Sequence, residues 1–99
     1  MLVGLGGIWV EALRDVRLLP ADADEPQIIE ALQGLRAAKL LAGVRGAPRA
    51  DVDAAAKAVL AIGRLMRTVP GIVEIDVNPL MVHAKGQGAT ALDALIVAQ

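Results

Sequence analysis

The last third of the chain predicts a β-hairpin, and the register of this hairpin decides which of its residues face each other. Two mainly apolar stretches, at 72–82 and 89–97, are joined by the turn-forming letters HAKGQG. Counting outward from a two-residue turn at Lys85–Gly86 places Asn78 opposite Asp93. A loop one residue longer would move Asp93 to the other face, so the expectation depends on this turn.

The first of these strands carries oxygen-bearing side chains on one face. Glu74, Asp76 and Asn78 occupy every second position, with apolar residues between them. Because alternate residues of a strand point the same way, the three side chains share a face. From alternation alone, the plain interpretation is the solvated outer face of a half-buried sheet.

Asp93 gives this face a second interpretation, as a candidate metal site. Facing residues in an antiparallel ladder have Cβ atoms about 5 Å apart, so the Asn78 amide oxygen and the Asp93 carboxylate would converge. Oxygen ligands of this kind suit a hard cation such as Mg²⁺. Asp93 also has a plain alternative as a turn cap near the strand end, and both interpretations stay open.

Pro79 follows Asn78 directly and has no N–H to give to a ladder. It fits an edge strand or a bulge. A bulge at this point would re-aim the Asn78 side chain and would also change the count of facing pairs.

A first helix is predicted after the N-cap Asp24. Gln27 stands three residues after the cap, as in a capping box. Ile28, Leu32 and Leu35 form the apolar stripe, and the helix is expected to end near Leu35 because Gly34 weakens it.

The second helix has the clearest pattern in the chain. Asp51 is its expected N-cap, and Pro70 with Gly71 is its stop. Steps of three and four residues give one apolar face. That face consists of Val52, Ala55, Val59, Ile62, Met66 and Val69.

Two further strands are expected near the start, at 8–13 and 16–20. The order β-β-α-α-β-β then predicts an α+β fold, in which an antiparallel sheet carries two helices packed on one face. With 99 residues, we expect residues 1–99 to form a single domain.

Composition excludes several classes of function. The net charge of −1 argues against a nucleic-acid partner. The absence of cysteine excludes disulfides and thiolate metal sites and fits a cytoplasmic protein. No apolar run reaches the roughly 18 residues of a membrane span, so we expect no membrane partner.

The stretches EIDVNPLMV and ALDALI resemble the C-terminal half of the ATP-grasp domain of ADP-forming acyl-CoA synthetases. The stretches GLGGIWVEALRDVRLLP and LLAGVRGAPRADVDA look like further segments of that family, in the same order. Related ATP-grasp regions occur fused in protein acetyltransferases, and succinyl-CoA synthetase β chains are more distant relatives. The chain therefore looks like the C-terminal subdomain of an ATP-grasp fold, a fragment of a larger protein.

The resemblance implies a metal site that serves a nucleotide. Asn78 and Asp93 match the positions that bind the Mg²⁺ accompanying ATP or ADP, and Glu74 matches an acid that supports the site. Nucleotide-binding candidates are Glu11, Gly6, Gly7 and Arg45. Each of these four has a plain alternative, as the outward face of an edge strand, a simple turn or a solvated loop arginine. His83 matches no phosphoryl-carrying motif, and no catalytic residue is expected.

The resemblance also implies a function. The parent protein would convert ATP, a carboxylic acid and CoA into acyl-CoA, ADP and phosphate, with this segment supplying nucleotide and Mg²⁺ binding and inactive alone. Its partners would be an N-terminal ATP-grasp lobe and CoA-binding or ligase domains. The alternative is a degenerate structural or regulatory module beside an acetyltransferase or CoA-binding domain. Self-association through uncovered apolar surface is a further expectation.

Overall fold

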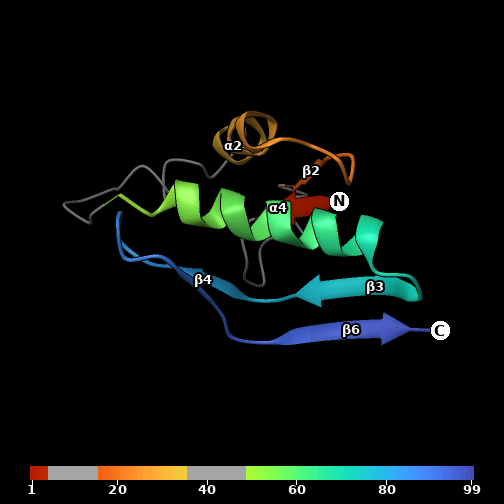
Figure 1. Cartoon of the computed structure of the whole chain (residues 1–99). Coiled ribbons are helices and arrows are strands. Elements are labelled where there is room, and N and C mark those ends of the chain that lie inside the picture. Colours follow the sequence, from red (N-terminus) through yellow and green to blue (C-terminus); the bar gives the residue numbers. More distant parts are fainter. Residues whose placement is uncertain (5–15, 36–48) are drawn as a thin grey trace.

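The computed structural model describes residues 1–4, 16–35 and 49–99 (Figure 1). Within them the element order confirms the predicted α+β class and the β-β-α-α-β-β arrangement. Each of the two predicted C-terminal strands is divided into two shorter strands. The three strand pairings described are all antiparallel. The elements are β1 (Leu2–Gly4), β2 (Val16–Leu18), α2 (Glu25–Gln33), α4 (Val52–Thr68), β3 (Ile72–Val77), β4 (Leu80–Val82), β5 (Ala89–Ala91) and β6 (Ala94–Ala98).

The N-terminal strands form a short ladder in which Val3 faces Arg17. β2 is the strand predicted at 16–20, and its partner is β1, at the start of the chain. The other predicted strand, at 8–13, lies outside the described residues. The structure therefore tests only one of the two N-terminal strands that the sequence predicts.

The predicted capping box starts α2. Asp24 Oδ1 accepts the backbone N–H of Gln27, and Gln27 Oε1 accepts the backbone N–H of Asp24, both at 2.9 Å. This exchange satisfies N–H groups that have no partner within the helix. The predicted stripe is confirmed, since Ile28, Leu32 and Leu35 are all buried.

The second predicted helix is α4, which begins after the N-cap Asp51 and stops before Pro70. It packs against α2, and the core between them is wholly aliphatic among the described residues. Neither of these two helices is long and apolar enough to cross a membrane. The buried core residues are Ala23, Ile28, Leu32, Leu35, Ala55, Ala56 and Val59.

α4 comes very close to the turn that follows β2. A Cβ atom at Gly63 would lie 2.4 Å from the backbone oxygen of Ala21, so position 63 has no room for a side chain. One turn later, Arg67 Nε donates to the same oxygen at 3.2 Å. Glycine at this position therefore lets α4 pack directly on the backbone of the turn.

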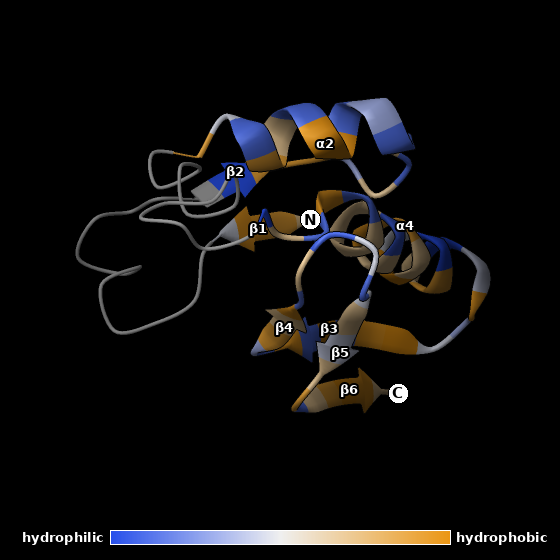
Figure 2. Ribbon diagram, turned by 90° about the vertical axis from the view of Figure 1, so that its left-hand side faces the viewer, coloured by the Kyte–Doolittle hydropathy of each residue, from blue (hydrophilic) through white to orange (hydrophobic). Residues whose placement is uncertain are grey.

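The C-terminal strands form a ribbon beside α4. α4 contacts β3 and β4, whereas α2 packs on α4 and β1, so α4 separates α2 from the ribbon (Figure 1). In both views β6 lies on the far side of β3 from α4 (Figures 1 and 2). Every residue of β6 is exposed, including Leu95 at 57% and Ile96 at 54%. α4 thus lies along one side of β3 and leaves β6 outside.

The turn of this ribbon is tied to the N-terminus of α4 by one carboxylate. Asp51 Oδ1 accepts the backbone N–H of Ala54 at 3.1 Å, which is the predicted N-cap bond. Its Oδ2 accepts the N–H groups of Gly86 at 3.1 Å and Gly88 at 2.9 Å. Asp51 therefore joins a helix start and a hairpin turn that are more than thirty positions apart in sequence.

Backbone bonds strengthen the same junction. The N–H of Asp51 donates to the carbonyl of His83, and the N–H of Lys85 donates to the carbonyl of Arg49, both at 2.8 Å. The residues just before α4 thus extend along the end of β4 like a short third strand. The hairpin turn is held to α4 through both backbone and side chain.

These contacts hold the pKa of the Asp51 carboxyl below its ordinary value. The hydrogen bond from the N–H of Gly88 has the largest effect on this pKa, and those from Ala54 and Gly86 act in the same direction. Desolvation opposes the shift, and the positive charge of Lys57 favours it. The carboxylate is stabilised because three donors point at it.

The lowered pKa predicts a pH-dependent contribution to stability, measurable by comparing the chain with an Asp51→Asn variant. The ionised carboxylate stabilises the folded chain fully above about pH 4, and this contribution is lost as the pH falls through the folded pKa. In urea denaturation, the difference in free energy of unfolding between the two proteins is expected to be constant near neutral pH and to shrink in acid. A difference that stays constant down to about pH 3 would contradict this assignment.

Candidate functional site

Asn78 and Asp93 lie opposite each other where the ribbon changes from one ladder to the next. The N–H of Asn78 donates to the carbonyl of Asp93 at 3.0 Å. On the turn side of this pair, the N–H of Leu92 donates to the carbonyl of Pro79, also at 3.0 Å. The backbone thus brings together the two residues that the hairpin count had paired.

The predicted register holds on both sides of this junction. Val77 faces Ala94 in the β3–β6 ladder, and Leu80 faces Ala91 in the β4–β5 ladder. The strand assignment is interrupted at Asn78 and Pro79, but the facing pairs on both sides keep the same register. The only described register shift lies between Ile72 and Glu74, at the far end of β3 from Pro79. The two-residue turn therefore sets the alignment of the whole ribbon up to β3.

The donor chemistry of this pair fits a hard cation. Asn78 offers a neutral amide oxygen and Asp93 a carboxylate, and both residues are exposed. Mg²⁺ usually takes one or two protein groups and leaves its other positions to water and phosphate. An exposed amide and carboxylate on adjacent strands leave room for those other ligands. Coordination of one metal ion by both side chains stays a prediction.

Glu74 lies on the same strand but at a distance from the pair. It is exposed and faces Val97 in the ladder. Asn78 comes four positions after Glu74, which corresponds to roughly 13 Å along the strand. The described residues hold no group of three or more His, Asp or Glu side chains arranged for a metal. Glu74 is therefore too distant to share one ion directly with Asn78, and its supporting role stays a prediction.

The four nucleotide-binding candidates lie outside the described residues. They are Glu11, Gly6, Gly7 and Arg45. His83, by contrast, is described: its Nε2 lies 2.9 Å from Thr90 Oγ1, across the β4–β5 ladder. This bond gives His83 a local structural partner and fits the absence of a phosphoryl-carrying motif.

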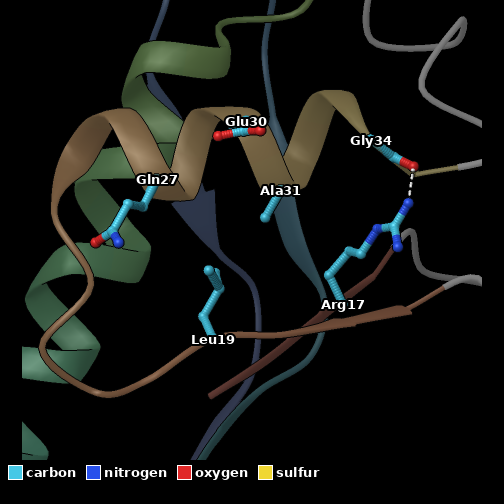
Figure 3. A pocket seen from close by; sticks show the side chains of 6 residues that line it. All are labelled: Arg17, Leu19, Gln27, Glu30, Ala31 and Gly34. Atoms are coloured by element: carbon cyan, nitrogen blue, oxygen red, sulfur yellow. Dashed lines mark hydrogen bonds between the residues drawn. The ribbon is translucent and has the colours of Figure 1, made fainter.

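A recess of about 390 Å³ lies between α2 and the strand β2 (Figure 3). Arg17 projects toward the end of α2, where its Nη2 donates to the carbonyl of Gly34 at 2.7 Å. This bond satisfies a carbonyl at the helix end. The residues that line the recess come from α2, β2 and the residues next to them, and none belongs to the ribbon that carries Asn78 and Asp93. We therefore assign Arg17 a structural role and do not count the recess as part of the metal site.

Sequence reasoning identified Asp51 only as a helix cap and missed its bonds to the hairpin. Two signals were available: an aspartate has a second oxygen when one caps a helix, and Gly86 and Gly88 supply backbone N–H groups in an open turn. Neither signal says which acid meets which turn, because that contact joins distant parts of the sequence.

Comparison with known proteins places these residues in a family. Residues 1–98 match a family model described as an ATP-grasp domain. A trans-feruloyl-CoA synthase from an unidentified prokaryote is 42% identical over 99 residues, which cover 100% of this chain and 14% of that protein. The beta subunit of the ADP-forming acetate–CoA ligase II of Pyrococcus furiosus is 35% identical over 98 residues, covering 98% of this chain and 42% of that subunit.

Solved structures give the same result. A dinucleotide-forming acetyl-coenzyme A synthetase from Ca. Korarchaeum cryptofilum, in complex with coenzyme A and Mg-AMPPCP, matches with a TM-score of 0.90 at 34% identity. The match covers 99% of this chain and 45% of that one. The chain thus spans less than half the length of each of these proteins.

The shared face of Asn78 and Asp93 can be tested by engineered cross-linking, since the chain has no cysteine of its own. Facing residues of a ladder lie at the Cα separation that a disulfide requires. We expect the double variant Asn78→Cys/Asp93→Cys to oxidise readily, with loss of free thiol and a 2 Da fall in mass, as two hydrogens leave.

The matched control is Asn78→Cys/Leu92→Cys. It moves the second cysteine by one residue, to the other face of the strand, and should keep its free thiols. Equal oxidation of both double variants would show that the two side chains do not share a face.

Proposed function

The chain belongs to the ATP-grasp family, and we propose that it forms the Mg²⁺- and nucleotide-binding part of an ADP-forming acyl-CoA synthetase. The complete protein would convert ATP, a carboxylic acid and CoA into acyl-CoA, ADP and phosphate. The observation that carries this proposal is the position of Asn78 opposite Asp93, with exposed oxygen donors, in a chain of this family.

The two residues have complementary tasks in this proposal. Asp93 supplies one negative charge, which attracts a divalent cation, and Asn78 supplies a neutral oxygen that fixes the direction of approach. When bound, Mg²⁺ neutralises phosphate charge and orients the phosphates for transfer. Because the pair spans two hydrogen-bonded strands, its geometry is set by the ladder.

The relatives support a role on the nucleotide side. The feruloyl-CoA synthase is named for a large aromatic acid and the Pyrococcus ligase for the two-carbon acetate, yet both match this segment over nearly its full length. A segment that is shared by enzymes named for such different acids is better suited to the step that their reactions have in common. The Korarchaeum structure, described as a complex with Mg-AMPPCP, supports Mg²⁺ and an adenine nucleotide as that part.

A second candidate is a degenerate module with a structural or regulatory role beside an acetyltransferase or CoA-binding domain. It is favoured by the lack, among the described residues, of any cluster of three metal-capable acids or histidines. The two candidates differ in one measurable property. A degenerate module would have no use for Mg²⁺ with ADP, even when the other ATP-grasp lobe is present.

We expect Asp93→Asn to weaken divalent-ion binding. In a Mn²⁺ titration followed by broadening of backbone amide signals, the variant should lose about 10–100-fold in affinity, the size of effect known even for groups outside the inner ligand shell. The control is Glu30→Gln, which removes the same charge from an exposed position on α2, across α4 from the ribbon. Equal loss in both variants would indicate a general charge effect and count against the site.

The chain by itself is expected to be inactive as a ligase, because the groups that hold the rest of the nucleotide and CoA are assigned to other parts of the parent protein. The measurement is release of ADP and formation of acyl-CoA from ATP, CoA, Mg²⁺ and short-chain acids. Sustained turnover by the 99-residue chain would refute the proposed division of labour.

A further inference from the structure

Asp51 is the one side chain among the described hydrogen bonds that connects the core helix α4 to the hairpin turn. One oxygen caps the helix and the other accepts two N–H groups of the turn. Helix α4 is itself fixed, since Ala55, Ala56 and Val59 are in the buried core. The carboxylate therefore connects a helix anchored in the buried core to the turn of the ribbon.

The hairpin needs such a connection to keep its register. β4 and β5 share only three facing pairs. The turn beyond them contains Gly86 and Gly88, both with positive φ, at 85° and 83°. Glycines in this region leave the unanchored turn many alternative conformations. On the other side, the strands are interrupted at Asn78 and Pro79. A ladder this short holds its alignment poorly by itself, and single hydrogen bonds, such as those from Asn78 to Asp93 and from His83 to Gly88, continue the pairing beyond its ends.

The register of this short ladder fixes the candidate metal pair. Leu80 faces Ala91, and only one further pair of positions separates them from Asn78 and Asp93. A slip of one residue in the turn would be passed along β4 and β5. It would move Asp93 to the other face of the ribbon, away from Asn78.

We propose that Asp51 is a positioning residue for the candidate metal site: by tying the hairpin turn to the N-terminus of α4, it keeps Asn78 and Asp93 opposite each other. The metal-binding part of this inference rests on the proposed function. The part that concerns register stands on the hydrogen bonds alone. Asp51 itself does not touch the metal pair.

The experiment compares Asp51→Ser with Asp24→Ser in the full chain. Serine is a good N-cap, so each variant retains its helix start. Asp24 caps α2 and has no described contact with the hairpin, which makes it a matched control. The readouts are Mn²⁺ affinity, from broadening of the Asn78 and Asp93 amide signals, and hydrogen exchange of the Asn78 and Leu92 amides, which donate across the junction.

In Asp51→Ser we expect Mn²⁺ affinity to fall about tenfold and exchange of the two amides to speed up about tenfold, the effect of losing a charge-assisted hydrogen bond. Asp24→Ser should change neither, although it affects helix capping in the same way. Equal results for the two variants would overturn the proposal.

The two readouts also distinguish a failure of metal binding from a failure of the role of Asp51 in register. If the unmodified chain shows no Mn²⁺ broadening at Asn78 or Asp93, the proposed function fails, while amide exchange still decides whether Asp51 holds the pair in register. If Asp51→Ser loses its helical circular dichroism, Asp51→Asn replaces it. That variant retains one acceptor oxygen, so it should show smaller effects in the same direction, and no effect would count against the proposal.

Discussion

The bidentate use of one carboxylate is the constraint on which the described arrangement depends. Helix α4 is anchored in the core, the ribbon carries the candidate site, and Asp51 joins the two through bonds to Ala54, Gly86 and Gly88. A neutral side chain at this position can cap the helix, but it lacks a second charged acceptor for the turn. Local helix capping and long-range positioning of the hairpin are therefore combined in one residue.

α4 packs against other elements on two of its sides. On one side it packs against α2 and the turn at Ala21, with Gly63 allowing backbone contact. On the other side it contacts β3 and β4. The core is built from small aliphatic side chains, so stability depends on many close contacts and not on a few large anchors. The candidate site lies just before Leu80, which packs against that core, and its exposed oxygens can reach a ligand.

Much of this structure could be predicted because the signals are local. The capping box of Asp24 and Gln27 lies within four residues, and the pairing of Asn78 with Asp93 follows from a two-residue turn. The contact of Asp51 with Gly86 could not be predicted, because it depends on how a helix and a hairpin pack in three dimensions. Alternation in the sequence also suggested a half-buried sheet, whereas β6 is uncovered because α4 packs mainly against β3, β4 and β5. The metal-binding role proposed for Asn78 and Asp93 rests on their donor chemistry combined with register, and on family resemblance, and it stays a prediction.

β6 has a consequence for how this segment behaves outside its proper context. Its side chains are apolar, all of its residues are exposed, and among the described strands it pairs only with β3. A strand with these properties is a template onto which a strand of another molecule can add, and natural proteins normally blunt such templates with charge or proline. Here neither device is present between Ala94 and Ala98. The tendency of this segment to aggregate in concentrated solution therefore depends on what covers β6.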